Sequence, residues 1–430
     1  VVTPANQRST SNGHSMLQLT EDDDAITLDG ERFQVTFGKA AGTITALTYT
    51  GRPVILRGPS LQIWRAPTDN DANTWGEEKA AIRWREAGYD RLQERVEIVH
   101  ADHLGAQAAR IVVHSVSEPS PLNGAPRWPR WEQLIEQIIN FLNQLFDVGQ
   151  VQEVAVQLRI DFAALPGAVQ AEKVRALVTQ LDQQERIPEL IQAVHHKAQA
   201  IAQQQHMPEW MLESIRRLAS IPAPQLIAEL KPVYRTRFEN TYTYTVTSDG
   251  AIVLEHALTP SRPLPFLPRV GVRLTLPGDL ETFTWYGRGP LESYADRKWG
   301  MAVGVYHGTV REQYFPYPKP QENGNKTDVR WAALSNAEVG LLVVGMPQFN
   351  VSAHYCTAED FAAAAHTYEI RWRPEITLNL DYAQSGLGGA SCGPGTLPQY
   401  LIQPEPVRWS LRLRPFAAAD GSPVELSKRF

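Results

Sequence analysis

The chain has 430 residues, with 41 lysines and arginines against 47 acidic residues and a formal net charge of −6 at pH 7. This balance argues against nucleic-acid binding, which usually requires a basic patch. No apolar run of about 18 residues or more is present, so no transmembrane helix is expected. The two cysteines lack metal-site spacing and need no oxidising compartment, so the cytoplasm is the default location.

The first part of the chain has the pattern of a β-domain. Residues 1–16 are rich in Ser, Thr and Asn, and we predict a disordered lead-in there. Beyond it, short strands are predicted at 25–28, 33–37, 43–49, 61–64, 96–100 and 109–116, and residues 77–87 have helical composition.

Composition changes abruptly near Pro119. From there to about Leu230 the chain is rich in Gln, Glu, Leu, Ile and Ala at helical spacing, which predicts four to six short helices. Strand alternation resumes at 236–246 and continues to Leu413. The flanking strands would otherwise form a hairpin, and exposed turns tolerate insertions. The predicted domains are a lead-in (1–16), a discontinuous β-sandwich (17–118 plus 231–418), an inserted helical domain (119–230) and a C-terminal tail (419–430).

The most informative motif is Arg65-Ala66-Pro67-Thr68-Asp69-Asn70-Asp71. It places two carboxylates, a carboxamide and a guanidinium near Trp64 and Trp75. Planar polar groups bind sugar hydroxyls, and aromatic faces stack on the C–H surfaces of pyranoses. Three interpretations remain open for Asp69 and Asp71: first turn capping, then sugar or active-site contact, then metal coordination.

Two later motifs follow in the same order as in one known family: Trp285-Tyr286-Gly287-Arg288-Gly289-Pro290-Leu291-Glu292-Ser293-Tyr294-Ala295-Asp296-Arg297 and Pro320-Gln321-Glu322-Asn323-Gly324-Asn325. Together the three motifs resemble the C-terminal β-sandwich, or small chain, of family 2 β-galactosidases over about two thirds of the chain. The resemblance implies a mainly-β fold, a large antiparallel β-supersandwich of the galactose mutarotase-like kind. The inserted α-helical bundle interrupts it.

The resemblance also implies a division of labour. In the family the two catalytic glutamates lie in a separate (β/α)₈ barrel, so no catalytic residue is expected in this chain. The chain would be the C-terminal part or small subunit of a β-galactosidase that acts on terminal β-D-galactosides such as lactose. Its partners would be the barrel portion or large subunit and the galactoside. No cofactor is expected here, because the family's Mg²⁺, and often Na⁺, is held mainly by the barrel.

The expected contribution of this chain is to the substrate-binding edge of the active site. The resemblance places the 72–79 loop at the barrel mouth, where Trp75 is either an aromatic platform or a residue packed on the next helix. In the glycine-rich loop 386–394, Cys392 stands where enterobacterial-type enzymes have Trp. A thiol cannot stack on a sugar, so aglycone contact is lost or moves to Trp75, Tyr400 or another ring. The expected site residues are Arg65, Asp69, Asn70, Asp71, Trp75, Glu322, Asn323 and Cys392.

The helical block resembles a second family. Leu145-Phe146-Asp147, residues 154–162, Leu165-Pro166-Gly167, residues 173–178 and Arg186–Ile191 are similar to bacterial effector-associated, death-like domains. Such domains pair with like domains, so residues 131–197 would recruit a partner helical domain; a plain helical bundle is the other interpretation. The alternative function for the chain is a non-catalytic carbohydrate-binding or scaffold protein, which the cysteine at position 392 favours.

Overall fold

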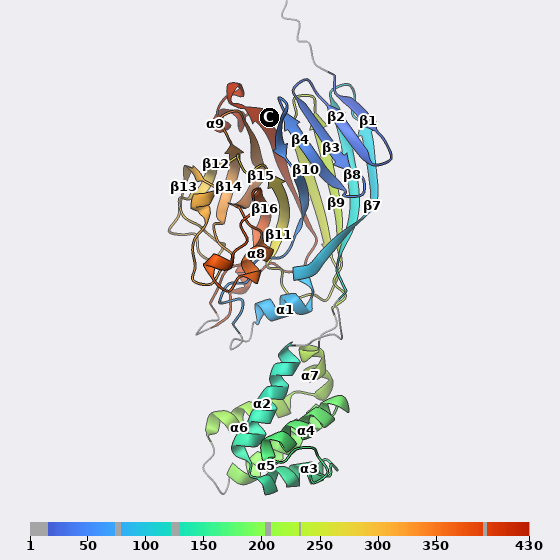
Figure 1. Cartoon of the computed structure of the whole chain (residues 1–430), viewed down its shortest axis with the longest axis vertical. Coiled ribbons are helices and arrows are strands. Elements are labelled where there is room, and N and C mark those ends of the chain that lie inside the picture. The colour runs from blue at the N-terminus through green and yellow to red at the C-terminus, as the bar shows by residue number, and fades with distance from the viewer. Residues whose placement is uncertain are drawn as a thin grey trace, which may run out of the picture. The chain divides into compact units, whose positions relative to one another are not determined.

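The computed structural model describes residues 16–73, 79–121, 129–202, 208–231, 234–389 and 394–429. The chain divides into a β-rich unit, Val1–Pro121 and Tyr234–Phe430, and a helical unit, Leu122–Val233 (Figure 1). The predicted fold class, a mainly-β supersandwich interrupted by an inserted helical bundle, is confirmed. Residues 1–15 of the predicted lead-in lie outside the described residues.

The described part of the β-rich unit contains seventeen strands connected through antiparallel pairings. They are β1 (Gln18–Glu21), β2 (Ala25–Asp29), β3 (Phe33–Gly38), β4 (Thr43–Tyr49), β5 (Arg52–Ile55), β6 (Arg57–Gln62), β7 (Leu92–His103), β8 (Ala108–Pro119), β9 (Phe238–Thr247), β10 (Ile252–Pro260), β11 (Arg269–Leu276), β12 (Thr282–Gly289), β13 (Ala302–Thr309), β14 (Lys326–Ser335), β15 (Val339–His354), β16 (Ile376–Gln384) and β17 (Val407–Ala417). Short helices α1 (Ala80–Glu86), α8 (Ala358–Ala363) and α9 (Pro423–Leu426), and 3₁₀ turns η1 (Tyr89–Arg91), η2 (Arg311–Gln313), η3 (Thr367–Glu369), η4 (Pro398–Tyr400) and η5 (Ala418–Asp420), lie between or after them.

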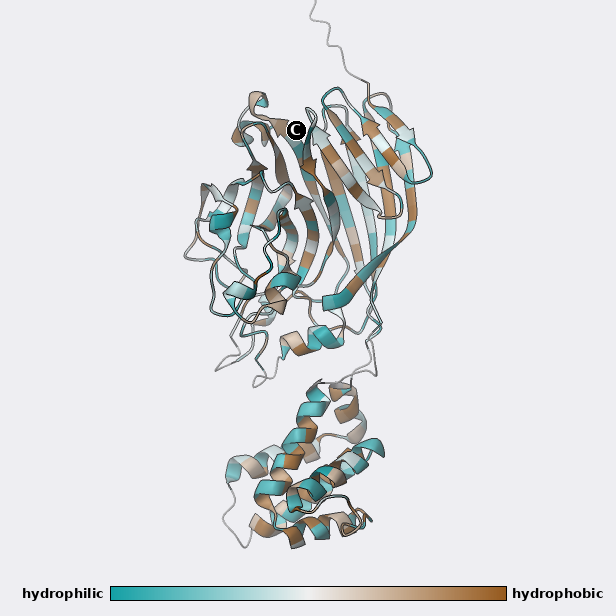
Figure 2. Ribbon diagram, in the orientation of Figure 1, coloured by the Kyte–Doolittle hydropathy of each residue, from teal (hydrophilic) through white to brown (hydrophobic). Residues whose placement is uncertain are grey.

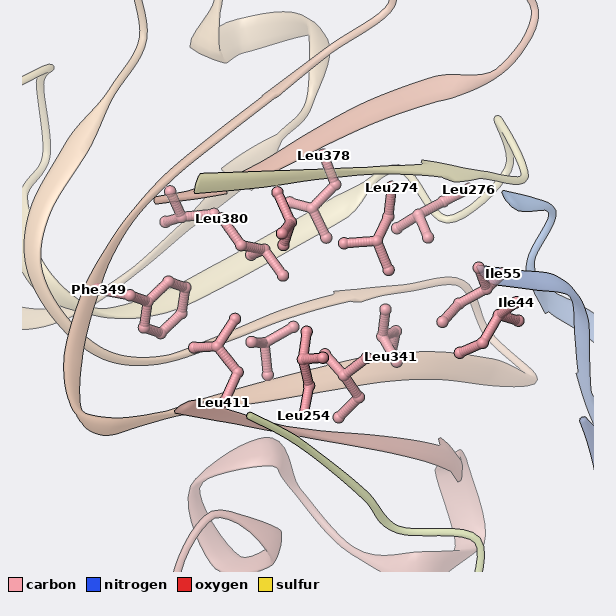
Figure 3. Close-up of a cluster of buried hydrophobic side chains, with 14 of the residues drawn as sticks. Ile44, Ile55, Leu254, Leu274, Leu276, Leu341, Phe349, Leu378, Leu380 and Leu411 are labelled. Carbon is pink, nitrogen blue, oxygen red and sulfur yellow. The ribbon is translucent and has the colours of Figure 1, made fainter. Parts of the chain in front are cut away.

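A large apolar core holds most strands of the β-rich unit together. Successive residues of a strand point to opposite faces of the sheet, and the ribbon in Figure 2 changes between hydrophobic and hydrophilic residues along the strands. In Figure 3 the leucines of β11 and β16 face those of β10, β15 and β17, with Ile44 and Ile55 at one end. Burying each such side chain stabilises the fold by about 1.5–3 kcal/mol.

Strands β8 and β9 are neighbours although the helical unit separates them in sequence. They pair antiparallel from Ala108 opposite Thr247 to Ser117 opposite Phe238. This confirms the interpretation that the insertion interrupts a hairpin. The strand predicted at 61–64 ends earlier, at Gln62, because the Gln62 side chain donates a hydrogen bond to the carbonyl of Trp64 at 2.7 Å and the chain leaves the sheet.

The helical unit has a separate core. Its described residues form six helices, the upper end of the predicted number: α2 (Pro129–Leu145), α3 (Val148–Gln157), α4 (Gln170–Gln183), α5 (Ile187–Ala202), α6 (Glu209–Ser220) and α7 (Ala223–Leu230). Apolar residues at helical spacing, such as Leu142, Val174 and Leu190, are fully buried between them. No helix in the described ranges is long and apolar enough to cross a membrane.

The two ends of the helical unit are held against each other. The ammonium of Lys231, just after α7, lies 4.1 Å from the ring centroid of Trp131 in the first turn of α2. Both side chains reach Asp182 of α4: the indole N–H donates to Oδ1 at 2.7 Å, and the Lys231 Nζ lies 3.5 Å from the same oxygen. This cluster, Trp131–Asp182–Lys231, therefore joins the beginning of α2 to the end of α7 through α4.

Candidate functional site

A buried arginine fixes the polar turn that follows β6. Arg65 is fully buried, and its Nη2 and Nε donate to Asp71 Oδ1 and Oδ2 at 2.7 and 3.2 Å. The same guanidinium donates to the carbonyls of Ser385 and Gly386 and lies over the ring of Trp84, 5.2 Å from its centroid. A bidentate buried pair of this kind fixes geometry as well as charge.

The turn is tied to the segment after β16. The amide of Asn70 donates to the carbonyls of Leu387 and Gly388 at 3.1 and 2.6 Å. Asp71 is buried and also accepts from the backbone N–H of Thr68 at 2.9 Å. Asn70 and Asp71 therefore shape the turn, whereas the exposed carboxylate of Asp69 remains available to a ligand.

A second carboxylate holds the same segment from its other side. Asp296 Oδ1 and Oδ2 accept from the backbone N–H groups of Leu387 and Gly388 at 3.1 and 2.7 Å. Gly388 has φ +59°, a left-handed conformation that glycine adopts without steric cost. A Cβ on Gly386 would lie 2.7 Å from the Asp296 carboxyl carbon, so glycine permits this close approach.

Replacing Asp296 with alanine should loosen this segment. It removes two charge-assisted hydrogen bonds to backbone N–H groups, which are worth about 1.5–3 kcal/mol each. We expect faster hydrogen exchange at the Leu387 and Gly388 amides with little change in the core strands, measured by exchange NMR. Asp102→Ala, which removes an exposed carboxylate paired with His100, is the control. Unchanged protection at Leu387 and Gly388 would contradict the assignment.

The motif from Trp285 to Arg297 begins in β12 and continues past the end of that strand at Gly289. Trp285 is buried within β12. The charged side chains do not form one network: Arg288 pairs with Asp328, and Arg297 pairs with Glu292, whereas Asp296 binds backbone. Arg288 is the last charged residue before the motif leaves the sheet at Gly289, and its partner Asp328 lies in β14.

Glu322 contacts the polar turn through its backbone. Its backbone N–H donates to the carbonyl of Ala66 at 3.1 Å, and its buried Oε1 lies 3.2 Å from Arg269 Nη2. Arg269 Nε is 3.1 Å from Asp381 Oδ2 as an ion pair, and the Gln384 side-chain amide donates a hydrogen bond to the same oxygen. Burial raises the pKa of Asp381 to about 7, and Glu322 adds to this rise while Arg269 opposes it.

Sequence reasoning missed Arg269, Asp381 and Gln384. The sequence contained a signal for the first two, because Arg269 and Asp381 are charged residues within strongly apolar strands.

The side chain of Asn323 holds its own loop in place: its Oδ1 accepts from the Phe315 N–H at 3.1 Å and its Nδ2 donates to the Gln321 carbonyl at 2.9 Å.

A pocket of about 190 Å³ opens at this turn. Its lining brings together the exposed carboxylate of Asp69, a guanidinium, a phenol and amide groups, which suit hydrogen bonding to hydroxyls. The lining residues are Thr68, Asp69, Asn70, Arg297, Tyr317, Gln321, Glu322 and Leu387.

Two other expected site residues, Trp75 and Cys392, lie outside the described residues. In the ranges that the structure describes, no group of three or more His, Cys, Asp or Glu side chains is arranged to hold a metal ion.

Comparisons with known proteins agree with the motifs. The family model of the β-galactosidase small chain matches residues 29–159 and 170–413, and that of effector-associated domain 7 matches residues 138–196. A β-galactosidase of Priestia megaterium is 40% identical over 162 residues, which are 37% of this chain and 16% of that protein. A β-galactosidase of Kluyveromyces lactis is 34% identical over 176 residues, 40% of this chain and 17% of that protein.

Among solved structures, galactose 1-epimerase from Lactobacillus acidophilus NCFM matches 94% of this chain and 98% of its own, with 9% identity and a TM-score of 0.33. A GalM/aldose epimerase homologue from C. elegans matches 44% of this chain and 63% of its own, with 10% identity and a TM-score of 0.26. The chain spans about one sixth of the length of the β-galactosidases it matches. The small-chain model, in contrast, extends over well over half of this chain, which therefore belongs to the β-galactosidase small chain family.

Proposed function

We propose that the chain is the C-terminal part or small subunit of a cytoplasmic family 2 β-galactosidase, which hydrolyses terminal β-D-galactosides such as lactose. It would complete the active site of a catalytic barrel located elsewhere in the polypeptide or in a separate subunit. The relatives named β-galactosidase support this proposal. The observation that carries it is the 190 Å³ pocket, where the fixed turn leaves the Asp69 carboxylate free.

The chemistry would be divided between the two parts. Retaining hydrolysis needs an acid/base and a nucleophilic carboxyl about 5 Å apart, and we assign both to the barrel, together with Mg²⁺ and Na⁺. The pocket groups of this chain would hydrogen-bond to hydroxyls on the aglycone side. Because Arg65, Asn70 and Asp296 hold the pocket walls in place, little ordering would be needed when substrate binds.

Hydrolysis of a chromogenic β-galactoside tests the proposal. The purified chain alone should be inactive, and a mixture with its barrel-containing partner should be active. In the mixture, Asp69→Ala and Trp75→Ala should each lower kcat/KM by about tenfold, equivalent to about 1.4 kcal/mol. Asp102→Ala, at an exposed carboxylate outside the pocket, is the matched control. Activity of the chain alone, or full activity of both variants, would contradict the proposal.

A second function is proposed for the helical unit, because residues 138–196 match effector-associated domain 7. It would recruit a like helical domain, in which case the β-rich unit could serve as a non-catalytic carbohydrate-binding scaffold. Sedimentation of the whole chain, alone and mixed with a chain carrying such a domain, tests this. Absence of any association at high micromolar concentration would rule it out.

A further inference from the structure

A larger pocket, of about 500 Å³, lies beside the candidate site. It opens among the connection from β12 to β13, the segment around η2 and the first residue of β14. Three large apolar side chains on its rim are mostly exposed: Trp299 at 86%, Leu291 at 63% and Phe315 at 51%. Exposed apolar side chains that gather at a pocket mark a binding surface.

The charged side chains that line the pocket are almost all engaged by the protein. Asp296 accepts two backbone N–H groups, and Glu312 accepts the N–H of Thr309 at 2.7 Å. Glu292 and Arg297 bond to each other. Lys298 donates to Asp328 at 2.9 Å. These groups therefore leave little uncompensated charge for a ligand.

Lys326 is different. It is 2% exposed and lines the pocket, and its Nζ lies 5.1 Å from the ring centroid of Trp285. Among the hydrogen bonds and ion pairs of the described residues, none involves this ammonium. Burial lowers its pKa to about 8, and Glu292 opposes that shift, so the cation is still the main form at pH 7. A buried cation without an acceptor is costly, and an anionic ligand would supply the acceptor.

We propose that this pocket binds an acidic saccharide, with the sugar ring stacked on Trp299 and its carboxylate paired with the Lys326 ammonium. The exposed indole face accounts for a pyranose, and the unpaired ammonium accounts for a carboxylate. A plain anion would leave the aromatic rim unused, and a neutral sugar would leave the ammonium without an acceptor. The site does not depend on a catalytic barrel, so it can be tested on the whole chain by itself.

Titration of the chain with methyl galacturonoside and methyl galactoside, followed by NMR, tests the proposal. These two probes differ only in a carboxylate in place of a hydroxymethyl group. The acidic probe should bind at least about tenfold more tightly than the neutral one, and sodium acetate should not bind at comparable concentration. Lys326→Met should abolish the preference for the acidic probe. Trp299→Ala should weaken both probes by about tenfold, whereas Trp210→Ala, at an exposed tryptophan of the helical unit, should weaken neither.

The pH dependence is a further readout. The affinity for the acidic probe should fall as pH rises through about 8, where Lys326 loses its proton, while the affinity for the neutral probe stays constant. The charged or titratable groups around Lys326 are Glu292, Asp296, Arg297, Lys298, Glu312, Tyr314 and His354. His354 stays neutral around pH 8, because burial lowers its pKa to about 4.

Several outcomes would overturn the proposal: no saturable binding, equal binding of both sugars, acetate binding as tight as the acidic sugar, or Trp299→Ala without effect. Failure of Lys326→Met to fold would leave Trp299→Ala and the pH series as decisive tests. Because galactoside hydrolysis plays no part in this titration, a failed β-galactosidase assay and a failed binding assay are distinguishable.

Discussion

Replacement of Arg65 with methionine is expected to lower the free energy of unfolding of the β-rich unit by about 3–5 kcal/mol. The side chain is fully buried, and its loss would leave the Asp71 carboxylate buried without its cation. It would also leave the carbonyls of Ser385 and Gly386 without their donor. Urea unfolding followed by tryptophan fluorescence measures the change, and Arg52→Met, in an exposed pair with Glu338, should cost about 1 kcal/mol or less.

A double variant separates the buried charge from the packing. Arg65→Met combined with Asp71→Leu removes both charges at once, and replacing a buried ion pair with apolar groups of similar volume is often close to neutral. The double variant should therefore be more stable than Arg65→Met alone. If the single arginine variant unfolds with the stability of the parent chain, Arg65 does not fix the turn as described.

Acidification from pH 7 to pH 5 should destabilise the β-rich unit by about 4 kcal/mol through two buried histidines, about 2 kcal/mol each. Burial lowers the pKa of His256 to about 3 and that of His354 to about 4. The indole N–H of Trp409 donates to His256 Nδ1 at 3.1 Å, so Nε2 carries the hydrogen and donates to Asn240 Oδ1 at 3.1 Å. Protonation of Nδ1 would break the bond to Trp409.

The direction of the effect follows from the two pKa values of each histidine. Between the lowered folded pKa and the unfolded value near 6.5, the unfolded chain binds the extra proton. This stability is therefore fully present above about pH 6.5 and is lost as pH falls towards 3 or 4. Unfolding free energies at pH 7, 6 and 5 should show a smaller slope in His256→Gln combined with His354→Gln. His100→Gln, at an exposed histidine, should keep the parent slope, and an unchanged slope in the double variant would refute the assignment.

The order of elements could be predicted from the sequence because it depends on local periodicity. Helical spacing after Pro119 and strand alternation around Tyr242 are local properties, and the structure has helices and strands at both places. The turn from Arg65 to Asp71 was recognised for the same reason. Its partners could not be predicted, because Ser385 and Gly386 lie more than 300 residues away in sequence. Likewise, only the pairing of β11 with β16 brings Arg269 to Asp381.

The Trp131–Asp182–Lys231 cluster, which joins the two ends of the helical unit, affects the order of folding. Strands β8 and β9 are separated by roughly 120 positions, and closing so long a flexible loop costs about 3 kcal/mol more in chain entropy than closing a four-residue hairpin loop. When Trp131, Asp182 and Lys231 come together, the folded insertion shortens the effective loop to the 11 residues between Pro119 and Trp131 and the six between Lys231 and Phe238. A helical unit that folds first would thus act as a local crosslink, which lowers the entropic barrier to the pairing of the two strands.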